Sequence, residues 1–203
     1  HIKALFGLEE VSRQWQKSHG REWTDDDVDR LYETFMPLQI DVAKNHTDII
    51  DGVPELFDAL RAREIKVAAT TGYPRVVADP IWHELNQQGL VADLVVCSDE
   101  VEQGRPAPWL IRRCMDGLGV LNESDVIKVG DTVPDIEAAR NAGVKSVAVT
   151  LTGNDVGLTQ AELQQLDSET RDDLHDQGMR RFVEAGADIV IRSVSELLSV
   201  LDD

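Results

Sequence analysis

From about residue 49 the chain alternates between short apolar runs and longer amphipathic segments, and this alternation limits its fold more than any other feature. Short runs rich in Val, Ile and Ala are typical of buried strands, whereas apolar residues at every third or fourth position are typical of helices. Strands are predicted over residues 66–70, 94–97, 126–129, 146–150 and 189–191. Helices are predicted over residues 53–63, 76–88, 108–118, 136–141 and 194–201. Because such alternating strands pair in parallel, we expect an α/β fold with a Rossmann-like, doubly wound sheet.

The first 48 residues show no strand pattern and instead have apolar residues at helical spacing in two stretches. Gly20 is expected to end the first helix, and Thr24, which three aspartates follow, to begin the second. Pro37 should break or kink the second helix because proline lacks a backbone N–H. We therefore expect a small helical cap subdomain over residues 1–48 and an α/β core over residues 49–203.

The chain begins with His1 in place of an initiator methionine and enters helical periodicity at once. The α/β pattern also begins with a helix, although such sheets usually open with a strand and a binding loop. We therefore expect the cap to be incomplete at its N-terminus and the core to lack its first strand.

The charge of the chain limits its partners. A formal net charge of −18 argues against non-specific nucleic-acid binding, which needs a cationic surface. An anionic substrate would need local positive charge to overcome this field. The sequence contains no apolar run that could cross a membrane and no secretory signal, so we expect a cytoplasmic protein without membrane contact.

Two further features have simple interpretations. Cys97 and Cys114 lack metal-ligand spacing, and we expect buried free thiols, with a disulfide or a reactive thiol as the alternatives. The segment 152–176 is polar and acidic, and Thr159 is placed to cap a helix within it. We expect a solvated excursion there, with a functional role as the alternative.

Two carboxylates flank the turn that follows the strand 126–129. Asp131 comes directly after Gly130, and Asp135 stands four residues later at the start of a helix. Close carboxylates repel each other unless a cation or a proton lies between them, which favours an oxygen-liganded ion such as Mg²⁺. The alternative is that Asp131 caps the turn and Asp135 caps the helix.

Two other strand ends carry groups that bind anions. Residues 70–73 (Thr-Thr-Gly-Tyr) offer a hydroxyl and free N–H groups, although a simple turn would have the same composition. Arg105, within residues 104–109 (Gly-Arg-Pro-Ala-Pro-Trp), offers a planar fork for phosphate, although an isolated Arg is more often a surface residue. Because all three signals fall at carboxyl ends of strands, together they indicate a phosphoryl-transfer site.

These motifs resemble the haloacid dehalogenase superfamily and, within it, the phosphonoacetaldehyde hydrolase (phosphonatase) family. The resemblance covers nearly the whole chain, and its most specific segments are residues 70–73, 104–109, 127–135 and 140–143. It implies hydrolysis of the carbon–phosphorus bond of phosphonoacetaldehyde to acetaldehyde and phosphate. In that chemistry a cap lysine forms a Schiff base with the aldehyde, and an aspartate takes up the phosphoryl group with the help of Mg²⁺.

The resemblance also assigns roles to individual residues. It implies that Asp131 is a metal ligand and that Asp135 is a metal-site or neighbouring acid. Thr71, Gly72 and Arg105 would hold the phosphonate, Tyr73 would face the aldehyde end, and His1 would support the Schiff-base lysine. It further implies a homodimer through the cap, to which Trp15 and Phe35 would contribute if they do not pack in a core.

The covalent groups of this chemistry have no match within residues 1–203. The nucleophilic aspartate belongs to an Asp-x-x-Gly-Thr strand, and the Schiff-base lysine lies three residues before the position of His1, so both are expected upstream. Lys3 is on the wrong side of that histidine and is expected to be a solvated helix residue. The chain as written is therefore expected to be inactive. Two alternatives remain, namely a Mg²⁺-dependent phosphomonoesterase of the same superfamily and a non-catalytic phosphate-binding module.

Overall fold

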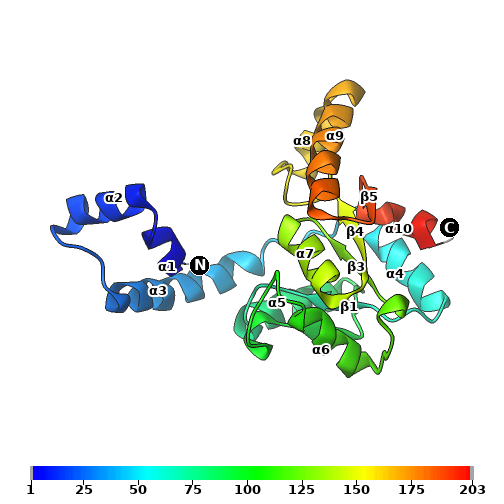
Figure 1. Ribbon diagram of the computed structural model, residues 1–203, viewed down its shortest axis with the longest axis horizontal. Coiled ribbons are helices and arrows are strands. Elements are labelled where there is room, and N and C mark those ends of the chain that lie inside the picture. Colours follow the sequence, from blue (N-terminus) through cyan, green and yellow to red (C-terminus); the bar gives the residue numbers. More distant parts are fainter. Residues whose placement is uncertain (1, 202–203) are drawn as a thin grey trace. The chain divides into compact units, whose positions relative to one another are not determined.

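The computed structural model describes residues 2–201. The chain divides into two compact units, residues 1–47 and residues 48–203, at a point next to the boundary that the sequence indicates. The described part of the first unit, residues 2–47, has three helices, which Figure 1 draws in blue to light blue: α1 (Ile2–Phe6), α2 (Glu9–His19) and α3 (Asp25–Ala43).

The prediction of two helices in the first unit is wrong, because its first stretch forms both α1 and α2. The chain leaves helical geometry at Leu8, whose extended backbone precedes α2. Gly20 ends α2 in the left-handed conformation (φ 68°), as predicted. Thr24 begins α3 as predicted, in a capping box with Asp27. Pro37 lies inside α3 and does not end it.

The first unit is held together by aromatic rings and by ion pairs, of which Arg21–Asp27 has the more buried carboxylate. The ring of the buried Phe6 lies 5.0 Å from Trp15 and 5.3 Å from Trp23. Arg21 donates to both carboxylate oxygens of Asp27, at 2.6 and 2.7 Å. Trp15 therefore packs in this small core, whereas Phe35 is 46% exposed.

Within residues 48–201 the structure has five parallel strands in two sheets. The strands are β1 (Ala68–Thr70), β2 (Leu94–Val96), β3 (Ile127–Gly130), β4 (Lys145–Val149) and β5 (Ile189–Ile191). β1 pairs with β2, and the second sheet has the order β3-β4-β5. Among the described residues neither β1 nor β3 has a second strand partner. All pairs are parallel, as the alternating pattern predicts.

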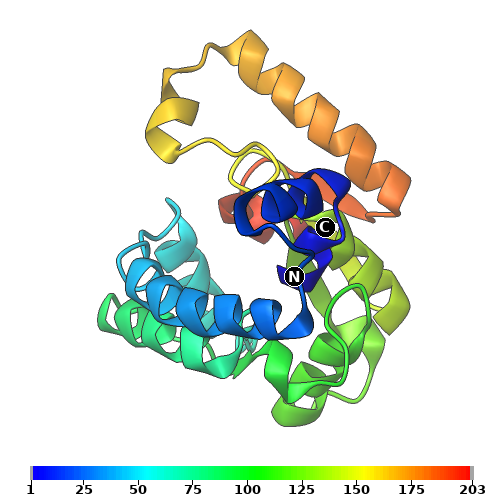
Figure 2. The same cartoon turned by 90° about the vertical axis from the view of Figure 1, so that its left-hand side faces the viewer.

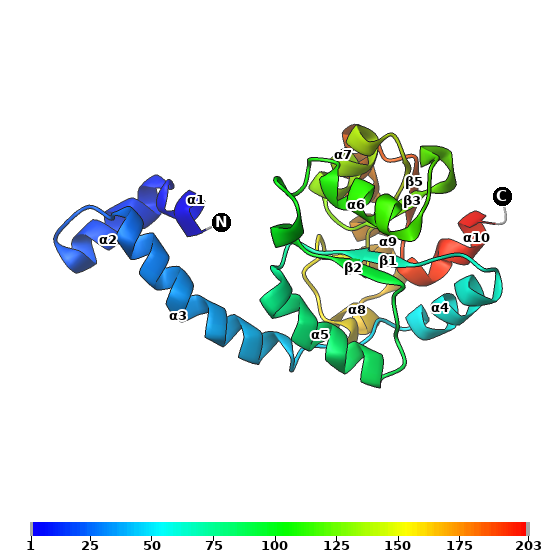
Figure 3. The same ribbon diagram turned by 90° about the horizontal axis from the view of Figure 1, so that it is seen from below.

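Helices cover both faces of the strands, as expected for a doubly wound sheet. The helices are α4 (Val53–Ala62), α5 (Arg75–Gln87), α6 (Trp109–Leu118), α7 (Val133–Ala142), α8 (Gln160–Gln165), α9 (Ser168–Ala185) and α10 (Leu197–Leu201), with short 3₁₀ turns η1 (Ser98–Glu100), η2 (Glu123–Asp125) and η3 (Val194–Glu196). Figure 3 shows α5 and α6 on opposite sides of β1 and β2.

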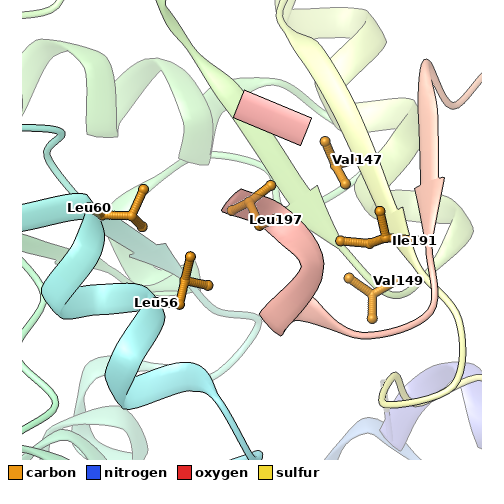
Figure 4. Close-up of a cluster of buried hydrophobic side chains, with 6 residues drawn as sticks. All are labelled: Leu56, Leu60, Val147, Val149, Ile191 and Leu197. Carbon is orange, nitrogen blue, oxygen red and sulfur yellow. The ribbon is translucent and has the colours of Figure 1, made fainter. Parts of the chain in front are cut away.

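Alternation along β4 divides the core between the two faces. Val147 and Val149 pack with Leu56 and Leu60 of α4 and with Leu197 of α10 (Figure 4). Ala148 between them points the other way and packs with Ile136 of α7 and Phe182 of α9. Each face of the strand is therefore buried by helices, which explains its continuous apolar sequence.

The acidic segment 152–176 forms a loop, α8 and the first half of α9. Figure 2 shows α9 as a long orange helix. Thr159 caps α8 and forms a capping box with Glu162, as predicted. No residue of 152–176 is buried, in agreement with a solvated excursion, whereas α9 continues beyond this segment to Ala185 and buries Phe182 in the core.

Both cysteines are free and buried, as expected. Burial raises the pKa of the Cys114 thiol to about 11, so this thiol stays protonated near neutral pH. No helix within residues 2–201 is long and apolar enough to cross a membrane.

Candidate active site

Three segments that follow different strands meet around the side chain of Arg105. This residue lies between β2 and α6, and its Nη1 donates to Oδ1 of Asp135, at the start of α7, at 2.6 Å. Its Nη2 lies 3.3 Å from the position that a β-carbon on Gly72, after β1, would occupy. The structure thus brings together three of the sequence-predicted site residues at the carboxyl ends of the strands.

Asp135 is a buried carboxylate with two cationic partners. Its side chain is 1% exposed, and its Oδ1 is shared by Arg105 and by Lys128 Nζ, at 2.8 Å. The Thr132 hydroxyl donates to Oδ2 at 2.6 Å. Burial would raise the pKa of the Asp135 carboxyl, but the charges of Lys128 and Arg105 and the Thr132 hydrogen bond outweigh it. The pKa therefore lies below its usual range, and the group is a carboxylate near neutral pH.

Gly130 is required by the close approach of Asp135. A β-carbon at position 130 would lie 2.2 Å from the Asp135 β-carbon, which is far inside van der Waals contact. The absence of a side chain at the end of β3 therefore lets α7 begin directly against the strand.

Asp131 lies at the same edge in a different environment. It is half-buried, and its Oδ2 accepts the Asn154 backbone N–H at 2.8 Å. Its Oδ1 forms no hydrogen bond or ion pair with residues 2–201. The capping alternative is not supported, because Thr132 occupies the cap position of α7 and no side chain caps this helix.

The donor set at this edge fits part of a Mg²⁺ site. Asp131 offers a carboxylate oxygen of the kind that Mg²⁺ binds. Both oxygens of Asp135 already bind side chains of this chain. Across residues 2–201 no group of three or more His, Cys, Asp or Glu side chains could hold a metal ion. Asp131 therefore suits one ligand of a Mg²⁺ site that needs further ligands from substrate, water or another segment.

The residues after β1 form a tight turn that is open to binding partners. The Thr71 hydroxyl accepts the Tyr73 backbone N–H at 3.1 Å, and the Thr71 N–H donates to the Val96 carbonyl. Gly72 and Tyr73 are exposed. Thr71 thus shapes the turn, while the hydroxyl proton remains available to a ligand. His1, the remaining predicted site residue, lies outside the described residues.

Sequence reasoning missed Lys128. Its ammonium lies 2.8 Å from Asp135 and also donates to the Val129 carbonyl at 2.7 Å, and its side chain is only 13% exposed. A lysine inside an otherwise apolar strand is the signal that could have revealed it, because a buried lysine nearly always has a charged partner.

Two surface cavities lie elsewhere in the second unit. One of about 140 Å³ is lined by residues that include Phe57 and Asp93, and one of about 460 Å³ by residues that include Trp109 and Arg113. None of the predicted site residues lines either cavity. The convergence of charged groups around Asp135 therefore identifies the candidate site better than cavity size does.

Comparisons with known proteins agree with this geometry. Residues 1–149 match the family of haloacid dehalogenase-like hydrolases. Phosphonoacetaldehyde hydrolase of Bacillus cereus (strain B4264) is 35% identical over 202 residues, covering 100% of this chain and 76% of the relative. The enzyme of the same name from Bacillus thuringiensis (strain Al Hakam) matches equally well. The crystal structure of a phosphonoacetaldehyde hydrolase-like protein from Oleispira antarctica is 33% identical with a TM-score of 0.95, covering 100% of this chain and 74% of that one.

The chain therefore belongs to the haloacid dehalogenase-like hydrolases and, among them, to the phosphonoacetaldehyde hydrolase family. The resemblance indicated by the sequence motifs is confirmed. The expected α/β fold and the expectation of a hydrolase are confirmed with it.

The first prediction concerns Lys128. We expect Lys128→Met to lower the free energy of unfolding by about 1–3 kcal/mol near pH 7, because Asp135 loses one of two cations in a buried setting. Since the pKa of Asp135 is depressed, its contribution is present above the unfolded pKa and is lost as the pH falls. The difference from wild type should therefore hold above about pH 4, the unfolded value, and narrow as the pH falls below it.

Urea unfolding at several pH values measures this effect. Lys145→Met, at the exposed first position of β4, is the matched control and should change stability little. A Lys128→Met protein as stable as this control at every pH would contradict the role of Lys128.

Proposed function

We propose that this chain is the larger part of an enzyme that hydrolyses phosphonoacetaldehyde to acetaldehyde and phosphate. The observation that carries the proposal is the placement of Arg105, which binds Asp135 and lies against Gly72 at the carboxyl ends of parallel strands. The similarity to enzymes named phosphonoacetaldehyde hydrolase supports the choice of substrate. This substrate enters as a small anion and needs neither nucleic acid nor membrane.

The charge balance around Asp135 suits a phosphonate group. Two cations, Arg105 and Lys128, surround one carboxylate, so the cluster retains about one positive charge. That local charge opposes the net charge of −18 where the anion would bind. Arg105 Nη2, the exposed Gly72 backbone and the Thr71 hydroxyl are the donors that we assign to the phosphonate oxygens, and Tyr73 is assigned to the aldehyde end.

Asp131 is the residue that we assign to Mg²⁺, with Asp135 as the neighbouring acid that holds Arg105 and Lys128. A bound Mg²⁺ would offset the charge that gathers on the phosphoryl oxygens during transfer. The Asn154 N–H binds Oδ2 of Asp131 and leaves Oδ1 for the metal.

Carbon–phosphorus cleavage also requires two covalent groups. A Schiff base between a lysine and the aldehyde acts as an electron sink, so that carbon can leave, and an aspartate accepts the phosphoryl group before water releases it. We place the aspartate on a strand between β1 and β3, because each of these strands lacks a second partner within residues 2–201 and Arg105 spans their carboxyl ends. The lysine and a supporting His1 belong to the cap in this proposal.

Lysine trapping tests the reaction type. With phosphonoacetaldehyde and borohydride, a protein that carries an Asp-x-x-Gly-Thr strand and the cap lysine in addition to residues 1–203 should form a reduced covalent adduct. Residues 1–203 alone should form none and should release no detectable acetaldehyde, because neither covalent group is present.

Two results would contradict this proposal. Acetaldehyde release by residues 1–203 alone would show that the groups needed for the reaction lie within these residues and not outside them. Hydrolysis of sugar phosphates by the longer protein without an adduct would favour a phosphomonoesterase, and phosphate binding without turnover would favour a non-catalytic module.

A further prediction concerns Arg105. In the longer protein Arg105→Ala should lower kcat/KM about 100-fold or more, because a donor to the transferring group is lost. Arg113→Ala removes the same charge from an exposed position on α6 and is the matched control. Steady-state acetaldehyde release measures both variants, and a loss of less than about threefold in Arg105→Ala would remove Arg105 from the site.

We also propose a cytoplasmic homodimer that forms through the cap. The buried free thiols suit a reducing compartment. Exposed apolar side chains follow one another on α3 at helical spacing, a pattern that suits a helix–helix interface. They are Leu31, Tyr32, Phe35, Leu38 and Val42.

Sedimentation velocity tests the dimer. The wild-type protein should sediment as a dimer, and Phe35→Glu should shift it toward the monomer, because a charge would be buried in an apolar interface. Glu33→Gln changes an exposed neighbour on the same helix and should leave the dimer intact. A monomeric wild-type protein at micromolar concentration would contradict the proposal.

A further inference from the structure

One face of α9 contacts the loop of residues 150–155, which follows β4. His175 Nδ1 lies 2.8 Å from the Thr150 hydroxyl oxygen. A β-carbon on Gly178 would lie 3.0 Å from the Thr150 methyl carbon, so the helix approaches the loop closely there. Arg181 Nη2 forms an ion pair with Asp155 at 2.5 Å. These residues are spaced by three and therefore share one face of the helix.

The same loop contacts Asp131 from its other side. The Asn154 N–H donates to Asp131 Oδ2 at 2.8 Å. A β-carbon on Gly153 would lie 2.6 Å from the Asp131 β-carbon, so backbone and carboxylate are tightly packed. The loop is thus in contact with the proposed metal ligand on one side and with α9 on the other.

α9 is also anchored to the core and to Arg192, whose carbonyl accepts the backbone N–H groups of Leu151 and Thr152 in this loop. Phe182 is fully buried and packs against Ile136 and Ala148. Asp172, near the other end of the helix, forms an ion pair with Arg192 at 2.7 Å. A helix held at both ends can serve as a rigid support for a loop that has little regular structure of its own.

The Thr150 hydroxyl connects α9 to the sheet. Its oxygen lies 3.2 Å from the Ile191 carbonyl as well as 2.8 Å from His175 Nδ1. A hydroxyl has one proton, so donation to the Ile191 carbonyl requires that His175 Nδ1 carries the ring proton and donates to Thr150. In that arrangement the fully buried hydroxyl both donates and accepts a hydrogen bond.

We propose that His175, Gly178 and Arg181 are positioning residues, which hold the 150–155 loop and thereby orient the Asp131 carboxylate for a divalent cation. This inference rests on the proposed function for the role of Asp131. In this proposal α9 supports the site indirectly, through the 150–155 loop and Asp131, and none of the three residues touches the substrate. The physical reason is that a ligand must be held within about 0.5 Å of its productive position by groups that are themselves fixed.

The test compares variants of the longer protein, which carries the Asp-x-x-Gly-Thr strand in addition to residues 1–203. Arg181→Met removes the ion pair with Asp155, and Thr150→Val removes the hydroxyl while retaining the shape of the side chain. Arg180→Met is the matched control, because Arg180 is an exposed neighbour on α9 with no ion pair or hydrogen bond among residues 2–201, and its loss changes the net charge equally.

Two readouts are needed. Amide hydrogen exchange reports the order of residues 151–156, and electron paramagnetic resonance with Mn²⁺, used as the divalent probe, reports the dissociation constant at Asp131. We expect Arg181→Met to speed exchange about threefold and to weaken Mn²⁺ binding about threefold, as loss of a partly exposed contact does. Thr150→Val, which removes a buried hydroxyl, should have effects at least as large. Arg180→Met should change neither, and Arg181→Met and Arg180→Met should both unfold at nearly the wild-type urea concentration.

The outcomes separate this proposal from the proposed function. Equal exchange and equal Mn²⁺ binding in Arg181→Met and Arg180→Met would overturn the positioning role. Lower stability of Arg181→Met with unchanged Mn²⁺ binding would overturn it as well, because α9 would then act only on the fold. A wild-type chain that binds no Mn²⁺ would contradict the role of Asp131 in the proposed function, and the exchange comparison alone would then decide whether α9 holds the loop.

Discussion

The buried carboxylate of Asp135 organises the edge of the sheet on which the candidate site depends. A carboxylate that is 1% exposed needs compensation, and here Lys128 from β3, Arg105 from the segment after β2 and the Thr132 hydroxyl provide it. These partners come from three segments, so one desolvated charge fixes their relative positions. Arg105 in turn lies against Gly72 after β1, which links the two parallel sheets at their carboxyl ends.

This arrangement also resolves a conflict between charge and function. A chain with a net charge of −18 is a poor partner for a small anion unless positive charge is gathered locally. Two cations around a single carboxylate leave a local excess, while the ion pairs satisfy the buried groups. Asp131, four residues before Asp135, lies outside this network and bonds instead to the Asn154 backbone. The two acids of one motif therefore have different physical tasks.

Much of the fold could be predicted because its signals are local. Buried parallel strands need continuous apolar runs, and caps such as Thr159 and helix ends such as Gly20 depend on neighbouring residues. The division of the first stretch into α1 and α2 was not predicted, because apolar spacing continues through the interruption at Leu8. At Pro37 the predicted break does not occur, since α3 continues through this residue. Tertiary contacts override local propensity in such cases.

The same distinction between local and remote signals explains which residues of the candidate site could be predicted. Thr71, Gly72, Arg105, Asp131 and Asp135 were predicted from their positions after strands, because parallel topology brings the carboxyl ends of strands to one edge. Lys128 was missed because its importance depends on the distance to Asp135, a partner seven residues away on another element. The contacts of α9 with the 150–155 loop were invisible for the same reason.

The sequence by itself determined the class of fold, the order of its elements and the chemical groups at the strand ends, since these follow from periodicity and spacing. Only the tertiary structure decided which charges meet and which oxygen atoms remain open to a ligand. The physical reason is that electrostatic and hydrogen-bond energies depend on distance and burial, and both arise only when remote segments pack together.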